Sequence, residues 1–176
     1  MSVKSSATSV SNQNIEEVQI GAYRQISRLC LFFEAESKDD YQRILSFVSV
    51  AKGEIKEVEV VVYYFGKLPE PVPGNGSLFL VGKKDFKLFR QKGAALKEWL
   101  GTHEFDMLIS FAKEDREKSK RLIKDIKAKI KVGPNFPEAE PYFDMVLGKP
   151  GEKLEFGIFY EQVKHYFSQL NININL

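Results

Sequence analysis

The pattern of apolar and polar residues predicts a strand, a helix and a second strand in the first part of the chain. Residues 29–33 (LCLFF) are apolar without a break, which is typical of a strand covered on both faces. Ser37 then offers an N-cap, and apolar residues follow it at helical spacing until Gly53. The next stretch, at residues 58–65, is β-branched and aromatic, as strands are. Short connections between these elements predict a βαβ unit with two parallel strands.

The rest of the chain continues the alternation of strands and helices. We expect further strands at 78–81, 105–111, 129–132 and 142–147, and helices at 94–100, 113–128 and 156–170. Two connections rich in proline, at 69–76 and 134–141, interrupt these elements. Such alternation predicts an α/β fold, namely a single three-layer Rossmann-like domain with a mostly parallel sheet and helices on both faces.

The N-terminal residues differ in composition from everything that follows. Residues 1–20 are rich in Ser, Asn, Gln and Thr without a sustained apolar period. We therefore expect a flexible polar tail, with a short helix at 15–23 at its end. Residues 27–171 show no internal repeat and no break in composition, which predicts one α/β domain.

Composition and charge argue against several classes of function. The 26 Lys and Arg nearly balance the 24 Asp and Glu, for a net charge of +2, so nucleic acid is not expected as a partner. Local excesses, positive at 83–97 and 113–131 and negative at 138–161, are interpreted mainly as solvated faces. The longest apolar run has six residues, too short for a membrane span. The absence of a signal-peptide core near the start predicts a cytoplasmic protein.

Ligands of open α/β sheets bind beyond the carboxyl ends of the strands. Five candidates for such a crevice follow or end the predicted strands: Glu34, Glu36, Ser37, Ser110 and Asn135. Neither glycine-rich phosphate-binding motif is present, and the acidic turn after the first strand would repel a phosphate. The carboxylates near this turn, Asp39 and Asp40 included, are interpreted as helix-capping and solvated charges rather than a cation site. We therefore predict no metal and no cofactor.

No pair of nucleophile and base stands out. Cys30 lies inside an apolar strand, where a thiol usually packs and stays inert. His165 falls on the polar side of the last helix, and His103 lies before a strand, at the sheet edge opposite to the expected site. All three are interpreted as structural residues.

The connection at 134–141 is the candidate for contact with a partner protein. Its prolines stiffen it, so less entropy is lost when a partner immobilises it. We expect it to be exposed, with Phe136 as an apolar anchor and Glu138 and Glu140 beside it. In the alternative interpretation, Phe136 folds back to cover the edge of the sheet.

Several strand and turn patterns resemble those of a family of small uncharacterised bacterial proteins, classed as a domain of unknown function. The matching segments are residues 83–86 (KKDF) with Phe89, 104–109 (EFDMLI), 126–133 (IKAKIKVG) and 142–146 (YFDMV). With the early strand and helix, the similarity covers most of residues 27–170. This resemblance implies the α/β fold and carries no activity and no catalytic residue.

A second resemblance is to the N-terminal half of heptosyltransferase-type glycosyltransferases. In those enzymes a strand of the type (Y/F)D-apolar is followed by a helix and an AK-x-x-x-G strand, as at 105–111 and 128–133 here. They bind the sugar nucleotide mainly through a second domain, which we do not find in this sequence. The likeness therefore implies the fold rather than the transferase activity.

These observations favour a non-catalytic binding or accessory module that acts through contacts with a protein partner. The alternative is a small ligand-binding or transferase-like enzyme that uses the crevice at the carboxyl ends of the strands. An enzyme is neither established nor excluded by the sequence, and the partner, the ligand and the oligomeric state stay open.

Overall fold

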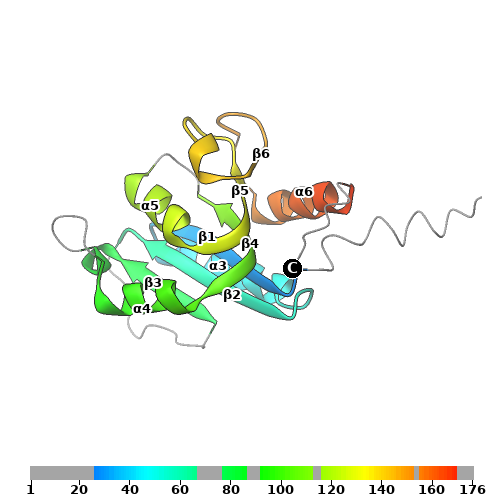
Figure 1. Ribbon diagram of the computed structural model, residues 1–176. Coiled ribbons are helices and arrows are strands. Elements are labelled where there is room, and N and C mark those ends of the chain that lie inside the picture. Colours follow the sequence, from blue (N-terminus) through cyan, green and yellow to red (C-terminus); the bar gives the residue numbers. More distant parts are fainter. Residues whose placement is uncertain (1–25, 67–76, 87–91, 113–115, 153–154, 170–176) are drawn as a thin grey trace, which may run out of the picture.

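The structure is a computed structural model that describes residues 26–66, 77–86, 92–112, 116–152 and 155–169. Its six strands are β1 (Arg28–Ala35), β2 (Glu57–Tyr64), β3 (Leu78–Gly82), β4 (Glu104–Phe111), β5 (Lys127–Pro134) and β6 (Met145–Leu147). Its α-helices are α3 (Lys38–Ala51), α4 (Ala94–Thr102), α5 (Glu117–Asp125) and α6 (Phe156–Gln169). The strands form one sheet in the order β3-β2-β1-β4-β5-β6, and every neighbouring pair is parallel. This order is that of a Rossmann-like fold (Figure 1).

The first βαβ unit forms where the sequence predicts it. The Ser37 hydroxyl accepts the backbone N–H of Asp40, and the Asp40 carboxylate accepts the backbone N–H of Ser37, so a capping box starts α3. Tyr41, Ile44, Val48 and Ala51 lie on the buried face of this helix. β1 then pairs with β2 over its whole length, from Arg28 opposite Glu57 to Ala35 opposite Tyr64.

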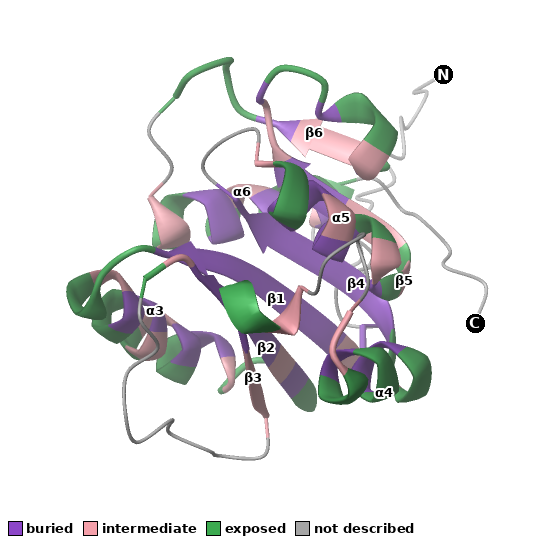
Figure 2. Cartoon of the chain, turned by 90° about the vertical axis from the view of Figure 1, so that its left-hand side faces the viewer, coloured by how far each residue is buried: buried purple, intermediate pink, exposed green. Residues whose placement is uncertain are grey.

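Helices cover both faces of the sheet, as predicted. The strand side chains that point to one face pack with α3 and α6, and those that point to the other pack with α4 and α5. Figure 2 shows these two helix pairs on opposite sides of buried strands. β1 is central and buried from Leu29 to Ala35 because both of its neighbours and both helix layers cover it.

Aromatic side chains fix the position of α6 against the sheet. The Phe156 ring, at the start of α6, lies 5.1 Å from that of Phe33 and 5.5 Å from that of Phe111. Phe33 and Phe111 stack at 4.5 Å near the ends of β1 and β4. The start of α6 therefore lies at the carboxyl edge of the sheet, and the helix ends toward the edge where β1 begins.

Two predicted elements differ from those observed. The helix expected at 113–128 is shorter, because Ile126 is extended and caps α5, and β5 already begins at Lys127. The strand expected at 142–147 is reduced to β6, because Pro141 lies in a 3-10 helix (Glu140–Tyr142) just before it. Asp144, which follows this helix, accepts the backbone N–H of Lys131 at 2.8 Å.

The remaining predictions concern the N-terminal tail and membrane-spanning helices. The polar tail at 1–20 and the helix at 15–23 lie outside the described part of the chain. Among the helices that the structure describes, none is long and apolar enough to cross a membrane.

Candidate functional site

The strand order reverses between β1 and β4, and this switch point is where Rossmann-like folds place their ligand. β1 pairs with β4 from Leu29 opposite Met107 to Phe33 opposite Phe111. The carboxyl ends of the two strands therefore bring Glu34 and Glu36 close to Ser110. Four of the five predicted crevice residues, Glu34, Glu36, Ser37 and Ser110, belong to these two strand ends.

Glu34 is buried at this point and bonded to α5. It is 3% exposed, and its carboxylate accepts a hydrogen bond from the hydroxyl of Ser119, which is also buried. Tyr63, the register partner of Glu34 on β2, is buried beside them. Burial raises the pKa of Tyr63, the Arg116 charge opposes this shift, and the Glu34 charge adds to it. Glu34 is therefore engaged by side chains of the chain itself at the carboxyl end of β1.

Arg116, at the start of α5, joins the residues that follow β1 and β2. Its guanidinium is paired with the Glu36 carboxylate and lies 4.0 Å from the centre of the Phe65 ring, after the end of β2. These contacts combine an ion pair with a cation–π interaction on one cation. Glu36 was a candidate ligand residue, and in the structure it is held by Arg116.

At the N-terminus of α3 the chain's own side chains take up several of the N–H groups that could bind an anion. The Asp40 carboxylate accepts the backbone N–H groups of Glu36 and Ser37, each at 3.2 Å. The Ser37 hydroxyl takes the Asp40 N–H. In dinucleotide-binding folds, such donors at a helix start bind the pyrophosphate. Here the chain's own carboxylate occupies them.

Ser110 and Asn135 are also engaged within the protein. The Ser110 hydroxyl is buried and accepts the Ala112 N–H at 3.2 Å. Asn135 follows β5, one strand beyond β4, and its side-chain amide donates to the Gly148 carbonyl at 3.3 Å. The structure therefore does not bring Asn135 into the crevice at the ends of β1 and β4.

The residues considered as nucleophile or base lie elsewhere. Cys30 is buried in β1, and burial raises the pKa of its thiol. The His103 ring stacks on Trp99 at 4.8 Å, and His165 faces Gln169 on the outside of α6. Among the described residues, no group of three or more His, Cys, Asp or Glu is arranged to hold a metal ion.

The connection after β5 has a different structure from the one expected, because Phe136 is not an exposed anchor. It is 7% exposed and meets the Phe143 ring edge-to-face at 5.8 Å. Phe143 in turn lies on the backbone of Gly133. Of the two interpretations of Phe136, the one in which it folds back over the sheet is correct, since burial of an aromatic ring is strongly favourable.

The exposed side of this connection forms a hollow of about 690 Å³. Its wall combines prolines, the aromatic residue Tyr142 and two exposed acids: Asn135, Phe136, Pro137, Glu138, Ala139, Glu140, Pro141, Tyr142, Val146 and Pro150. Glu138 adopts a left-handed backbone conformation, with φ of 60°. A non-glycine residue in this region costs about 1–2 kcal/mol, so the surrounding contacts must hold it.

Lys120 of α5 supplies such contacts. Its side chain is almost fully buried, and its Nζ lies 3.7 Å from a carboxylate oxygen of Glu138 and 5.4 Å from the centre of the Tyr142 ring. The hollow therefore has a rim fixed to α5 on one side and a floor fixed by Phe136 and Phe143 on the other. Preformed surfaces of this kind lose little entropy on binding.

The sequence profile of one protein family matches residues 2–170. The chain belongs to DUF6913, a family of unknown function. A comparison with curated proteins gives no match. The DUF6913 assignment agrees with the expected resemblance to a domain of unknown function and adds no activity to it.

Reasoning from the sequence did not identify three residues that shape these sites in the DUF6913 chain: Arg116, Ser119 and Lys120. All three lie in a segment that we interpreted as a solvated charged face. One signal was present, because Ser119 shares a helical face with the apolar Leu122 and Ile123 and is buried with them. A polar residue in an apolar stripe needs a buried partner, which here is Glu34.

Proposed function

We propose that this DUF6913 protein is a non-catalytic binding module that recognises a basic, partly apolar segment of a partner protein. The surface concerned is the hollow beside the β5–β6 connection. The observation that carries the proposal is the combination, in one preformed hollow, of exposed acids with proline and aromatic walls. Such a surface offers charge for orientation and apolar area for affinity.

The charges favour a basic occupant. Glu138 and Glu140 are both exposed on the wall of the hollow, and residues 138–161 carry six acids but only two lysines. Lys120 offsets part of the Glu138 charge, but the Glu138 side chain stays 76% exposed, and Glu140 adds a second exposed carboxylate. A partner segment with Lys or Arg would therefore meet complementary charge.

The contacts that the described residues make at the switch point give less support to the alternative of a ligand-binding or transferase-like enzyme. A ligand there would have to displace the Glu36–Arg116 pair and compete with Asp40 for the N–H groups at the start of α3. A likeness to heptosyltransferase-type enzymes implies only the fold. The resemblance to small bacterial proteins supports a bacterial origin for this module, and a cytoplasmic location remains part of the proposal.

The test places a photo-crosslinking amino acid at position 141, on the wall of the hollow, in the full chain. A matched control has the crosslinker at Glu98, an exposed site on α4. We expect position 141 to give a defined adduct in cells, with the crosslink mapping to a basic segment of the partner. Equal adducts at both positions would contradict the proposal.

Charge reversal then separates specific binding from chance capture. With the purified partner, the double variant Glu138→Lys and Glu140→Lys should weaken binding by more than tenfold and remove most of its salt dependence. Glu98→Lys, the matched control, should leave the affinity unchanged. Equal affinities of the double variant and the original protein would show that the partner binds elsewhere.

A further inference from the structure

Helix α6 buries one apolar face, and two large apolar side chains on its outer side are not covered by the described part of the chain. Phe159, Tyr160, Val163 and Phe167 are buried against the sheet. On the outer side, Ile158 and Tyr166 are 64% and 46% exposed, although both are large and apolar. A surface helix normally carries polar residues on its outer face, so two large apolar side chains that line one groove there mark a surface on which another segment could pack.

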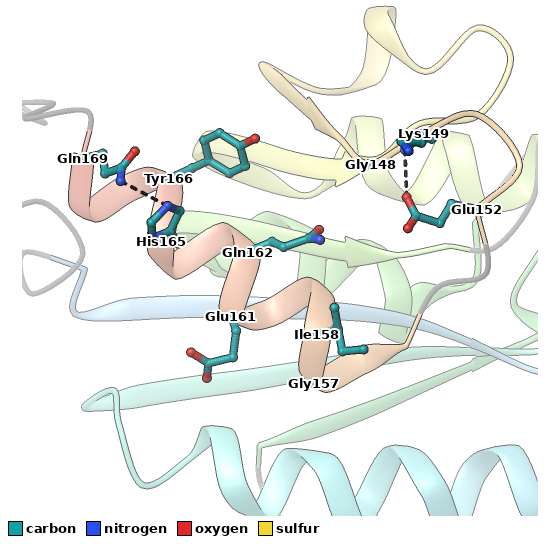
Figure 3. A pocket seen from close by; sticks show the side chains of 10 residues that line it. All are labelled: Gly148, Lys149, Glu152, Gly157, Ile158, Glu161, Gln162, His165, Tyr166 and Gln169. Atoms are coloured by element: carbon teal, nitrogen blue, oxygen red, sulfur yellow. Dashed lines mark hydrogen bonds between the residues drawn. The ribbon is translucent and has the colours of Figure 1, made fainter.

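The two side chains line a groove of about 1130 Å³ between α6 and the turn that follows β6. Ile158, Gln162, Tyr166 and Gln169 line it at intervals of three or four residues, which is one face of a helix. Gly148, Lys149 and Glu152 form the opposite wall. In Figure 3 the ring of Tyr166 projects from α6 on the side where Gly148 and Lys149 lie.

The helix that carries the groove is fixed. Lys164 binds Glu54, in the turn before β2, at 3.0 Å and Glu161 at 2.8 Å. These bonds outweigh the desolvation of the ammonium and raise the pKa of Lys164. The buried face of α6 and the bonds of Lys164 hold the helix in place, and Ile158 and Tyr166 therefore point outward.

We infer that residues 15–25 of this same chain dock in the groove and cover Ile158 and Tyr166. The first reason is where the described chain begins. Ile26 is buried in the same core layer as α6, and β1 starts at the edge of the sheet toward which α6 ends. Figure 3 shows the start of β1 near the end of α6 that carries Gln169. The 25 preceding residues therefore reach the domain at one end of the groove.

The second reason is the length and pattern of this segment. The groove follows the 14 residues of α6, about 21 Å of helix at 1.5 Å per residue. A stretch of comparable length precedes Ile26, and within it Ile15, Val18 and Ala22 recur at helical spacing. Asn14 and Glu17 stand three residues apart, as the N-cap and N3 residues of a capping box do.

The third reason is the family. The profile of DUF6913 begins at residue 2, so this N-terminal segment is part of the sequence that its members share. Residues 15–25 therefore lie inside the matched region and not beyond its end. The inference concerns a surface other than the hollow beside β5 and β6, and it does not depend on the proposed function.

The test uses the full chain with Gln162→Cys as a reporter inside the groove, because the native Cys30 is buried. The docked segment slows the reaction of this cysteine with a thiol reagent. Val18→Asp, which places a charge on the apolar stripe, should speed the reaction about tenfold, or about 1.4 kcal/mol of docking free energy. Val10→Asp, the matched change elsewhere in the tail, should leave the rate unchanged.

Two further measurements complete the test. Val50→Cys places a reporter at an exposed apolar site of α3 outside the groove, and its rate should not respond to Val18→Asp. Light scattering should give the mass of one chain. The inference is overturned if Val18→Asp does not change the rate at position 162, or if protection occurs only in a particle of two chains. The first result would leave the C-terminal residues or a partner as the occupant, and the second a neighbouring copy.

Discussion

The hydroxyl of Ser119, in α5, donates a hydrogen bond to the carboxylate of Glu34, at the end of β1. The two residues are 85 positions apart in the sequence, and both are buried. In Rossmann-like folds this position faces the ligand crevice. Here the same position joins a helix to the sheet, which is why we look for the contact surface of the protein outside the crevice.

Ser119→Ala should lower the free energy of unfolding by about 1.5–3 kcal/mol, the usual range for a buried hydrogen bond to a charged group. The physical reason is that the Glu34 carboxylate stays buried and loses one donor. Urea unfolding followed by circular dichroism measures the effect. Ser46→Ala, an exposed serine on α3, is the control and should change stability by less than about 0.5 kcal/mol. Equal small effects would mean that the Ser119 bond adds no stability.

The carboxylate of Asp106 lets us predict how the free energy of unfolding depends on pH. Asp106, at the start of β4, accepts the backbone N–H of Ser27 and of Arg28, both at 3.0 Å, and lies 3.1 Å from the Lys129 ammonium. Burial by itself would raise its pKa, but these bonds outweigh it and hold the pKa of Asp106 below its usual value. The folded protein therefore keeps this carboxylate charged at a pH where the unfolded chain already binds a proton.

The sign follows from this difference. The contribution of Asp106 is complete above the unfolded pKa, about 4, and is lost as the pH falls through the lower folded pKa. Asp106→Asn should therefore cost about 2 kcal/mol at neutral pH and should make the remaining stability fall less steeply below pH ~4. Urea titrations at neutral and acid pH measure this. Glu98→Gln, at an exposed site of α4, is the control and should change the free energy of unfolding at neutral pH by less than about 0.5 kcal/mol.

Much of the fold could be predicted because its signals are local. The strand β1 and the helix α3 follow from an unbroken apolar run, a capping serine and a regular apolar stripe. The boundary between α5 and β5 could not, since Ile126, Lys127 and Ala128 continue a segment rich in helix-forming residues although β5 already begins at Lys127. The start of β5 is decided by its pairing with β4, which joins residues far apart in the sequence.

The candidate sites were predicted less well for the same reason. Glu34, Glu36 and Ser110 could be placed at strand ends, because parallel strands end at one edge of a sheet. Their partners Ser119 and Arg116 come from a different helix, and no local pattern names them. The sequence allowed Phe136 to be either exposed or buried. Only its contact with Phe143 in the structure shows that it is buried.

This burial predicts the result of Phe136→Ala. Removal of the ring leaves a cavity beside Phe143 and should lower the free energy of unfolding by about 3–5 kcal/mol. Pro137→Ala, at the exposed neighbouring position, should cost only about 0.4–1 kcal/mol through the unfolded chain. Thermal and urea unfolding measure both. A loss for Phe136→Ala no larger than that of Pro137→Ala would contradict the buried position.

The glycine under Phe143 gives the last prediction. A Cβ at position 133 would collide with the Phe143 ring, and this ring has little room to move because Phe136 packs against it. Gly133→Ala should therefore destabilise the protein by about 1–3 kcal/mol through overpacking. Gly101→Ala is the matched change in α4, where nothing lies within 4 Å of the new methyl group. Because glycine is unfavourable in a helix, this second variant should gain about 0.5–1 kcal/mol. Opposite signs in urea unfolding of the two variants would confirm that close contact with Phe143 requires glycine at position 133, whereas a gain for both would refute it.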